Sequence, residues 1–114
     1  MNAADREPYF VSWDGRPQRE LFPGVRITVV SGEKLMLSRV ELDGGAVVPE
    51  HQHPHEQFGF VVQGDAEFTV GGETRHLTTG DYYAIPGGVL HKVVTGPGGA
   101  ICMDIFSPPR EEYR

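Results

Sequence analysis

Apolar and polar residues alternate along most of the chain in short runs, and no stretch carries the period of an amphipathic helix. Glycine and proline pairs separate these runs at a spacing of roughly ten residues, as in β-sandwiches and β-barrels. The pattern therefore predicts an all-β fold with strands at Val25–Val30, Leu35–Leu42, Ala46–His53, Gln57–Val62, Ala66–Val70, Glu73–Leu77, Tyr82–Ile85, His91–Thr95 and Ala100–Phe106.

Glycine-rich segments between these runs predict the connections. Gln63-Gly64-Asp65 is interpreted as the turn of one hairpin, and Gly71-Gly72 as the turn of the next. Gly96-Pro97-Gly98-Gly99 is expected to form a loose loop. The chain should then be a string of short strands joined by tight turns.

The length of 114 residues predicts a single domain, residues 1–114. Residues 1–24 are polar, contain three prolines and carry scattered aromatic side chains, so they are expected to form an arm laid over the body. Residues 25–106 should form the barrel and residues 107–114 a C-terminal tail.

Charge and composition narrow the class of protein. Ten Lys and Arg against sixteen Asp and Glu give a net charge of −6, which argues against a nucleic-acid partner. The sequence has no apolar run long enough to span a membrane and no apolar leader, so a cytoplasmic protein is expected. The single cysteine, Cys102, excludes an intrachain disulfide framework.

Three of the five histidines lie within the segment His51-Gln52-His53-Pro54-His55. Alternate residues of a strand point to the same face, so His51 and His53 can converge on one ion. An exposed cluster on a loop is the alternative interpretation.

Two spaced blocks resemble the two motifs of the cupin superfamily, whose members are small barrels of the double-stranded β-helix (jelly-roll) type. The first block contains Gly45, His51, His53, Gln57 and Gly64, and the second contains Gly80, Pro86, Gly88 and His91. The resemblance covers about residues 25–106. It implies one divalent transition-metal ion (Zn²⁺, Ni²⁺, Mn²⁺ or Fe²⁺) with His51, His53, Gln57 and His91 as ligands.

Glutamine occupies the third ligand position, where cupins usually have glutamate, and the adjacent Glu56 is a rival. The resemblance favours Gln57, and if Gln57 faces the barrel then strand alternation points Glu56 outward, so only a bulge could admit both. Three imidazoles and one amide leave the charge of a divalent ion uncompensated. Such a shell suits a Lewis acid better than an iron oxygenase, whose usual ligands include a carboxylate.

The last strand, Ala100–Phe106, is largely apolar on both faces. One face should meet the barrel interior, and the other either the arm or a second subunit. Together with the aromatic arm at residues 9–22, these apolar faces exceed what a barrel of this size needs internally, so the sequence predicts a homodimer.

The run Met-Asp-Ile-Phe-Ser-Pro-Pro-Arg-Glu-Glu-Tyr resembles the ending of the pectin-degradation (KdgF-type) cupins, as does His-Gln-His-Pro-His-Glu-Gln. The resemblance implies that Asp104 is catalytic and that Phe106 and Arg110 bind the substrate. It also implies a small anionic sugar-acid substrate, a 4,5-unsaturated uronate from pectin or alginate that is opened to a linear 4-deoxy-5-keto-uronate.

Two other functions stay open, because one fold hosts many chemistries. A metal-dependent dioxygenase or a polyketide cyclase is the first alternative, and a large apolar pocket would favour the cyclase. A non-enzymatic sugar-binding cupin is the second.

Overall fold

A computed structural model describes residues 7–114, so the first six residues of the predicted arm lie outside the described part. Residues 7–114 form eight strands, a C-terminal 3-10 helix and no α-helix, which confirms the all-β prediction. The strands are β1 Arg19–Phe22, β2 Val25–Ser31, β3 Met36–Leu42, β4 Val47–His51, β5 Glu56–Val70, β6 Glu73–Thr78, β7 Tyr82–Ile85 and β8 His91–Ser107. The 3-10 helix η1 spans Glu111–Tyr113.

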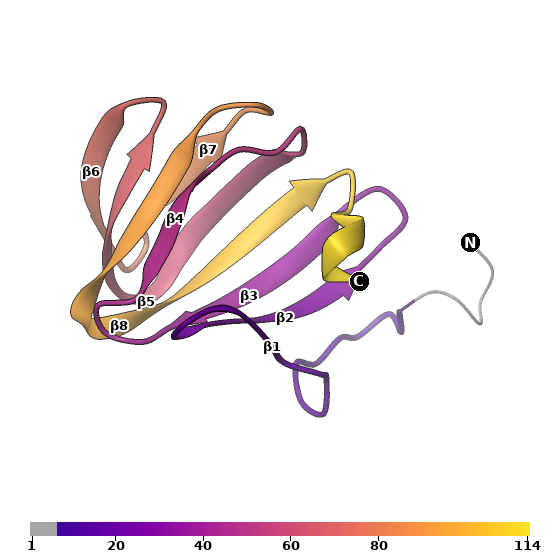
Figure 1. Cartoon of the computed structure of the whole chain (residues 1–114). Coiled ribbons are helices and arrows are strands. Elements are labelled where there is room, and N and C mark those ends of the chain that lie inside the picture. The colour runs from indigo at the N-terminus through magenta and orange to yellow at the C-terminus, as the bar shows by residue number, and fades with distance from the viewer. Residues whose placement is uncertain (1–6) are drawn as a thin grey trace.

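All strands belong to one antiparallel sheet with the order β1-β2-β3-β8-β5-β6. In addition β4 pairs with the first part of β8, and β7 pairs with the first part of β5. Because β5 and β8 pair along nearly their whole length and bend together, the sheet curls on itself (Figure 1). The curl encloses an interior onto which β2, β3, β4, β5, β7 and β8 all present one face.

The predicted hairpin at residues 63–65 is wrong, and so is the predicted loop at residues 96–99. Both segments lie inside long strands, β5 and β8, and mark the register shifts where these strands bend. Gly64 and Gly99 adopt positive φ angles of 85° and 81° there. A Cβ on Gly64 would lie 2.1 Å from the carbonyl oxygen of Gly99. These glycines therefore allow two strands to approach closely. The sequence had suggested a hairpin turn and a loose loop at these places.

The hairpin at Gly71-Gly72 is confirmed. β5 and β6 are directly connected there, and Val70 pairs with Glu73 across the turn. Both glycines adopt positive φ, as a two-residue hairpin turn requires.

The hydrophobic core lines the inside of the curled sheet with residues at every second position. It contains Val25, Ile27, Val40, Leu42, Ala46, Val61, Ala66, Phe68, Ala100 and Cys102. The outer face is apolar as well around β5, β7 and β8, where Phe58 is 53% and Tyr82 is 75% exposed. Met103 and Ile105 lie half-buried beside them on β8.

The predicted arm is divided between the barrel and solvent. β1 pairs with β2 and packs Leu21 and Phe22 against the core. Tyr9 and Phe10 are exposed instead, and residues 7–18 run outside the barrel (Figure 1). Within residues 7–24, β1 is the part of the arm that pairs with the barrel and packs against its core.

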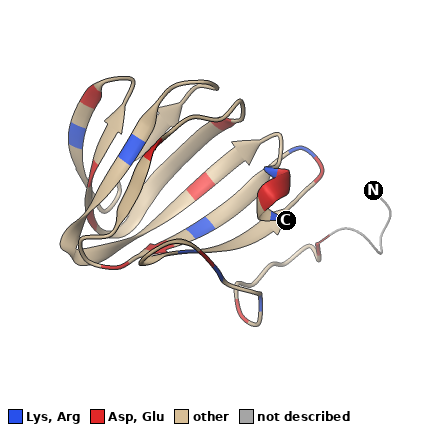
Figure 2. Cartoon of the chain, in the orientation of Figure 1, with Lys and Arg blue, Asp and Glu red and all other residues tan. Residues whose placement is uncertain are grey.

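The C-terminal tail folds back onto the rim of the barrel. Pro109 and Arg110 are buried, and the side chain of Arg19 donates a hydrogen bond to the carbonyl oxygen of Glu112. The 3-10 helix carries acidic residues next to basic ones at this rim (Figure 2). None of the helical structure in residues 7–114 has the length and apolar character needed to cross a membrane.

Candidate metal centre and adjoining pocket

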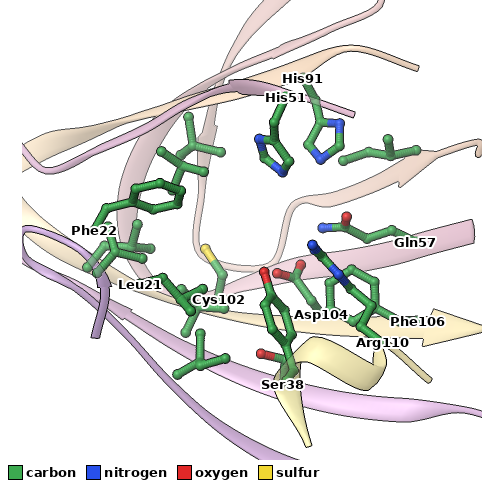
Figure 3. Close-up of a pocket in the computed structure, with 18 of the residues that line it drawn as sticks. Leu21, Phe22, Ser38, His51, Gln57, His91, Cys102, Asp104, Phe106 and Arg110 are labelled. Atoms are coloured by element: carbon green, nitrogen blue, oxygen red, sulfur yellow. The ribbon is translucent and has the colours of Figure 1, made fainter. Parts of the chain in front are cut away.

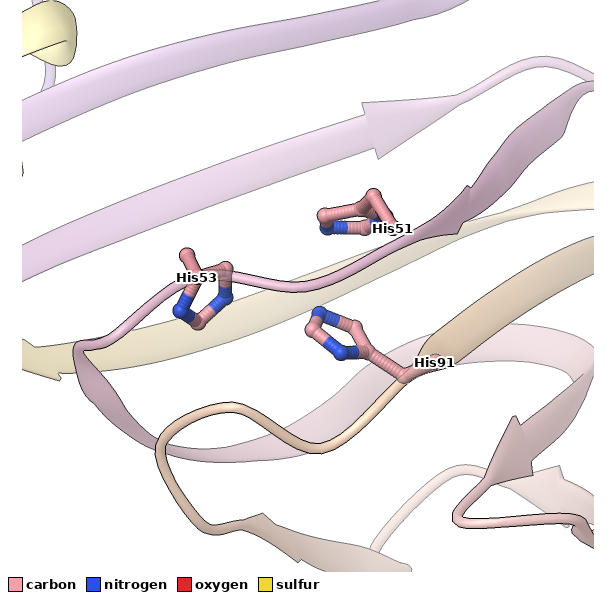
Figure 4. Close-up of side chains that lie close together, drawn as sticks. All are labelled: His51, His53 and His91. Atoms are coloured by element: carbon pink, nitrogen blue, oxygen red, sulfur yellow. The ribbon is translucent and has the colours of Figure 1, made fainter.

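Three histidines meet at one end of the barrel interior. His51 ends β4, His53 follows it, and His91 begins β8, where it pairs with His51 across the two strands. One nitrogen from each ring lies within 4.8 Å of the other two (Figure 4). The ring centroids of His51 and His91 are 4.1 Å apart. The predicted convergence of His51 and His53 is therefore observed, with His91 from the second block beside them.

Backbone carbonyls orient all three rings. Nδ1 of each ring contacts a carbonyl oxygen two residues away, at 2.8 Å for His51 and His91 and at 3.1 Å for His53. A carbonyl oxygen only accepts, so Nδ1 carries the proton in the neutral rings and Nε2 keeps its lone pair. This arrangement is usual for metal-binding histidines, whose second nitrogen is held by an outer partner.

Burial favours the neutral form of two of the three imidazoles, those of His53 and His91. It lowers the pKa of His53 to about 4, with a further contribution from the charge of Arg110, and it also lowers the pKa of His91. Nε2 of His91 is buried and has no hydrogen-bond partner among the described residues. A buried lone pair without a partner is costly, and a metal ion would satisfy it. These residues therefore fit a divalent ion.

Gln57, and not Glu56, faces this cluster. Gln57 is buried and Glu56 is exposed on the outside of β5, as strand alternation predicts. Oε1 of Gln57 lies 3.0 Å from Nε2 of His53. In the tautomer described above, Oε1 of Gln57 and Nε2 of His53 are both acceptors, so neither can donate a hydrogen bond to the other. A cation bound by both lone pairs would make this close contact favourable.

A pocket of about 330 Å³ extends from the histidines into the barrel. Its polar end is lined by His51, Gln57, His91, Asp104 and Arg110. Its other end is apolar and is lined by Leu21, Phe22, Val25, Ile27, Phe68 and Val93. Figure 3 shows Asp104 between the two ends, with Leu21 and Phe22 on one side and Gln57 and Arg110 on the other.

Asp104 projects from β8 into this pocket. Burial raises the pKa of its carboxyl to about 6, although hydrogen bonds from Tyr83 and Gln57 and the charge of Arg110 lower it. The hydroxyl of Tyr83 donates to Oδ1 of Asp104 at 2.5 Å. A carboxyl group whose pKa lies near neutrality can both give and take a proton under physiological conditions.

Arg110 reaches the pocket because the tail folds back. It is only 9% exposed, and its Nε donates to a carboxylate oxygen of Glu112 at 2.9 Å. The guanidinium carbon lies 4.1 Å from the ring centroid of Tyr113 and 5.1 Å from that of Phe106. The two rings thus hold the Arg110 guanidinium in the lining of the pocket.

Phe106 has little surface of its own. It is 2% exposed, and its ring is in edge contact with His53 at a centroid distance of 5.7 Å. It therefore packs between a histidine of the cluster and Arg110 and also lines the pocket, and its role in substrate binding stays a prediction.

Sequence reasoning missed Tyr83, Ser38 and Tyr113, all of which line the pocket. Alternation along Tyr82–Ile85 states only that one of Tyr82 and Tyr83 faces inward. Gly59, in the middle of a predicted strand, was the one available signal of a close approach at this place.

The curled antiparallel sheet and the histidine cluster define the class of protein. A family model described as the cupin domain matches residues 38–106, which is more than half of the chain. The chain belongs to the cupin family.

Several known proteins are similar to this chain over nearly its whole length. The pectin degradation protein KdgF of Dickeya dadantii is 34% identical over 107 residues, covering 92% of this chain and 96% of its own. The solved structure of KdgF from a Halomonas species is 33% identical, with a TM-score of 0.87, and covers 95% of this chain and 100% of its own. An RmlC-like cupin from Shewanella frigidimarina is 30% identical, with a TM-score of 0.88, and covers 96% of this chain and 98% of its own.

Proposed function

We propose that this cupin is a metal-dependent enzyme that opens the ring of 4,5-unsaturated uronates from pectin or alginate. The observation that carries the proposal is that a carboxyl group, Asp104, and a cation, Arg110, share one pocket with the histidine cluster. Its relative in Dickeya dadantii is named pectin degradation protein KdgF, and its relative in Halomonas is also named KdgF. These observations together support a role in uronate breakdown.

In this proposal His51, His53, Gln57 and His91 hold one divalent ion. When bound, the ion supplies Lewis-acid polarisation of a substrate oxygen. The neutral ligands leave it a net positive charge, which favours an anionic substrate. The backbone carbonyls behind the three Nδ1 atoms keep the rings turned toward it.

The chain's own residues bind the substrate and move a proton. Arg110 holds the uronate carboxylate, a geometry for which a guanidinium is well suited. Ring opening breaks the bond from the ring oxygen to C1, the C1 hydroxyl releases its proton as the aldehyde forms, and C4 gains a proton as the enol becomes the 5-keto group. No atom is gained or lost overall. Asp104 transfers the proton that completes the keto form.

The wild-type protein tests this proposal directly. Unsaturated galacturonate and the corresponding mannuronate or guluronate product are incubated with metal-loaded protein. Loss of the absorbance of the conjugated double bond is measured, and the linear product is followed by NMR. Ring opening faster than the spontaneous reaction supports the proposal, and a rate equal to the spontaneous one refutes it.

Arg110→Ala is expected to raise KM for the uronate by about 10-fold or more, with a smaller effect on kcat. The reason is the loss of a charge-assisted hydrogen bond to the carboxylate, which contributes roughly 1.5–3 kcal/mol. Steady-state kinetics measure both constants. Arg114→Ala, on the same tail but outside the pocket lining, is the matched control and should behave as wild type. An unchanged KM in Arg110→Ala would exclude this role.

We also propose that the chain forms a homodimer through the outer face of β5, β7 and β8. Phe58 and Tyr82 are exposed on this face, and Phe58 pairs across strands with the half-buried Ile105. Phe58→Glu is expected to halve the mass measured by light scattering at micromolar concentration, because a charge would be buried in the contact. Val47→Glu, at an exposed valine on β4, is the control. A monomeric wild type contradicts the proposal.

The apolar end of the pocket favours one second candidate, the polyketide cyclase. Its lining by aliphatic and aromatic side chains, Leu21 and Phe22 among them, suits a substrate with an extended apolar part. Thermal shift compares the two: stabilisation by an aromatic polyketide-like carboxylate but not by an unsaturated uronate would favour the cyclase.

A further inference from the structure

Asp104, Gly59 and Tyr83 form one transverse row across three neighbouring strands. Gly59 of β5 pairs with Asp104 of β8 on one side and with Tyr83 of β7 on the other. Residues paired in this way present their side chains to the same face of the sheet. Here that face is the pocket, which both Tyr83 and Asp104 line.

The middle of this row is occupied by the side chain of Tyr83, since Gly59 has none. A Cβ on Gly59 would lie 2.4 Å from ring carbons of Tyr83 and 2.5 Å from Oδ1 of Asp104. The φ angle of Gly59 is not positive, so the backbone here does not require glycine. What requires glycine is the space in which the phenol crosses the strand to reach the carboxylate.

Contacts on both sides hold Tyr83 in this place. Its ring packs on Phe68 at a centroid distance of 4.5 Å, and its hydroxyl donates to Oδ1 of Asp104 at 2.5 Å. Burial raises the pKa of Tyr83 well above its usual value, with a further contribution from the charge of Asp104. The phenol therefore stays protonated and remains a donor.

We propose that Tyr83 is a positioning residue for the ring-opening reaction: it holds the Asp104 carboxyl in one orientation through Oδ1, across the gap that Gly59 provides. The carboxyl group then meets the substrate in a set direction. This inference rests on the proposed function, in which Asp104 transfers the proton. Proton transfer depends steeply on geometry, and a misplacement of about 1 Å can cost roughly 100-fold in rate.

Tyr83→Phe tests the inference, because it keeps the ring on Phe68 and removes only the donor. It is expected to lower kcat by about 10- to 100-fold and to leave KM and the metal content close to wild type. Tyr82→Phe is the matched control: the same change in the next residue, whose side chain is exposed on the outer face. If wild type is active and Tyr83→Phe keeps the kcat of Tyr82→Phe, the inference is wrong.

A double mutant distinguishes action through Asp104 from a general structural effect. In the Asp104→Asn background, Tyr83→Phe is expected to cause no further loss of kcat, since the group that it positions no longer transfers a proton. If the loss of kcat in the double mutant equals the product of the losses in the two single mutants, Tyr83 acts independently of Asp104 and the inference is overturned.

Crystal structures give a readout that needs no activity. Wild type should show the Asp104 side chain in a single conformation, and Tyr83→Phe should show it in more than one. Gly59→Ala should displace the Tyr83 hydroxyl from Oδ1. A single, unchanged Asp104 conformation in both variants overturns the inference even if the wild type opens uronate rings. A wild type that fails to open them refutes the proposed function, while the structures still decide on the positioning.

Discussion

Asp104→Asn is expected to lower kcat for uronate ring opening by about 10²- to 10⁴-fold, the usual effect of removing a proton-transfer group. Asparagine has nearly the same shape, and its amide oxygen can still accept the hydrogen bond from Tyr83. It cannot exchange a proton near neutral pH, whereas burial places the pKa of the Asp104 carboxyl at about 6. The substitution thus removes the chemistry and keeps the packing.

Three measurements separate this effect from misfolding. KM, the metal content and the melting temperature of Asp104→Asn should each stay near the wild-type value, because the variant retains Arg110 and the histidines. Turnover equal to wild type would exclude Asp104 as the proton-transfer residue. The dioxygenase and cyclase alternatives would then gain weight, and oxygen uptake would identify the former.

The second large effect concerns the metal ion. Protein purified without chelator is expected to contain one divalent ion per chain, and His51→Ala to lose it together with activity. Even the loss of an outer partner of a ligand typically costs 10- to 100-fold in affinity, so the loss of a ligand should cost more. Elemental analysis measures the content, and chelation of the wild type should reproduce the loss of activity.

Thermal unfolding provides a second readout for the same site. An ion that binds only the folded chain stabilises it by about 2.7 kcal/mol at 100 times its Kd. The melting temperature of the wild type should therefore rise with added ion, and that of His51→Ala should not. His76→Ala, at an exposed histidine paired with Asp65, is the control. A wild type that stays metal-free under saturating Zn²⁺, Ni²⁺, Mn²⁺ and Fe²⁺ would refute the metal site.

Local sequence patterns determined the strand class, the inward side of most strands and the candidate ligands. The resemblance to the cupin motif selects Gln57 as the inward residue, and alternation then puts Glu56 on the opposite face and His51 and His53 on the same side. The reason is covalent geometry, since successive side chains of a strand point to opposite faces whatever the strand pairs with. The Gly71-Gly72 hairpin is equally local, because a two-residue turn depends only on its own φ angles.

Long-range pairing decided the rest. Glycine-rich segments at residues 63–65 and 96–99 carry turn-forming residues, yet each lies opposite the other in paired strands and becomes a bend. Glycine and its polar neighbours are favoured both in turns and at β-bulges. Their local preferences therefore could not show whether the chain reverses or only bends there. Only the pairing of β5 with β8 makes the long strands the stable arrangement.

The pocket depends on tertiary structure for the same reason. Arg110 lines it because its guanidinium packs against the rings of Phe106 and Tyr113, and Tyr83 reaches Asp104 because Gly59 lies between their strands. The sequence by itself determined which residues of a strand share a face and which types of side chain are present for metal and proton chemistry. The tertiary structure decided which inward residues meet, because contacts between strands far apart in the chain depend on their register and not on any local preference.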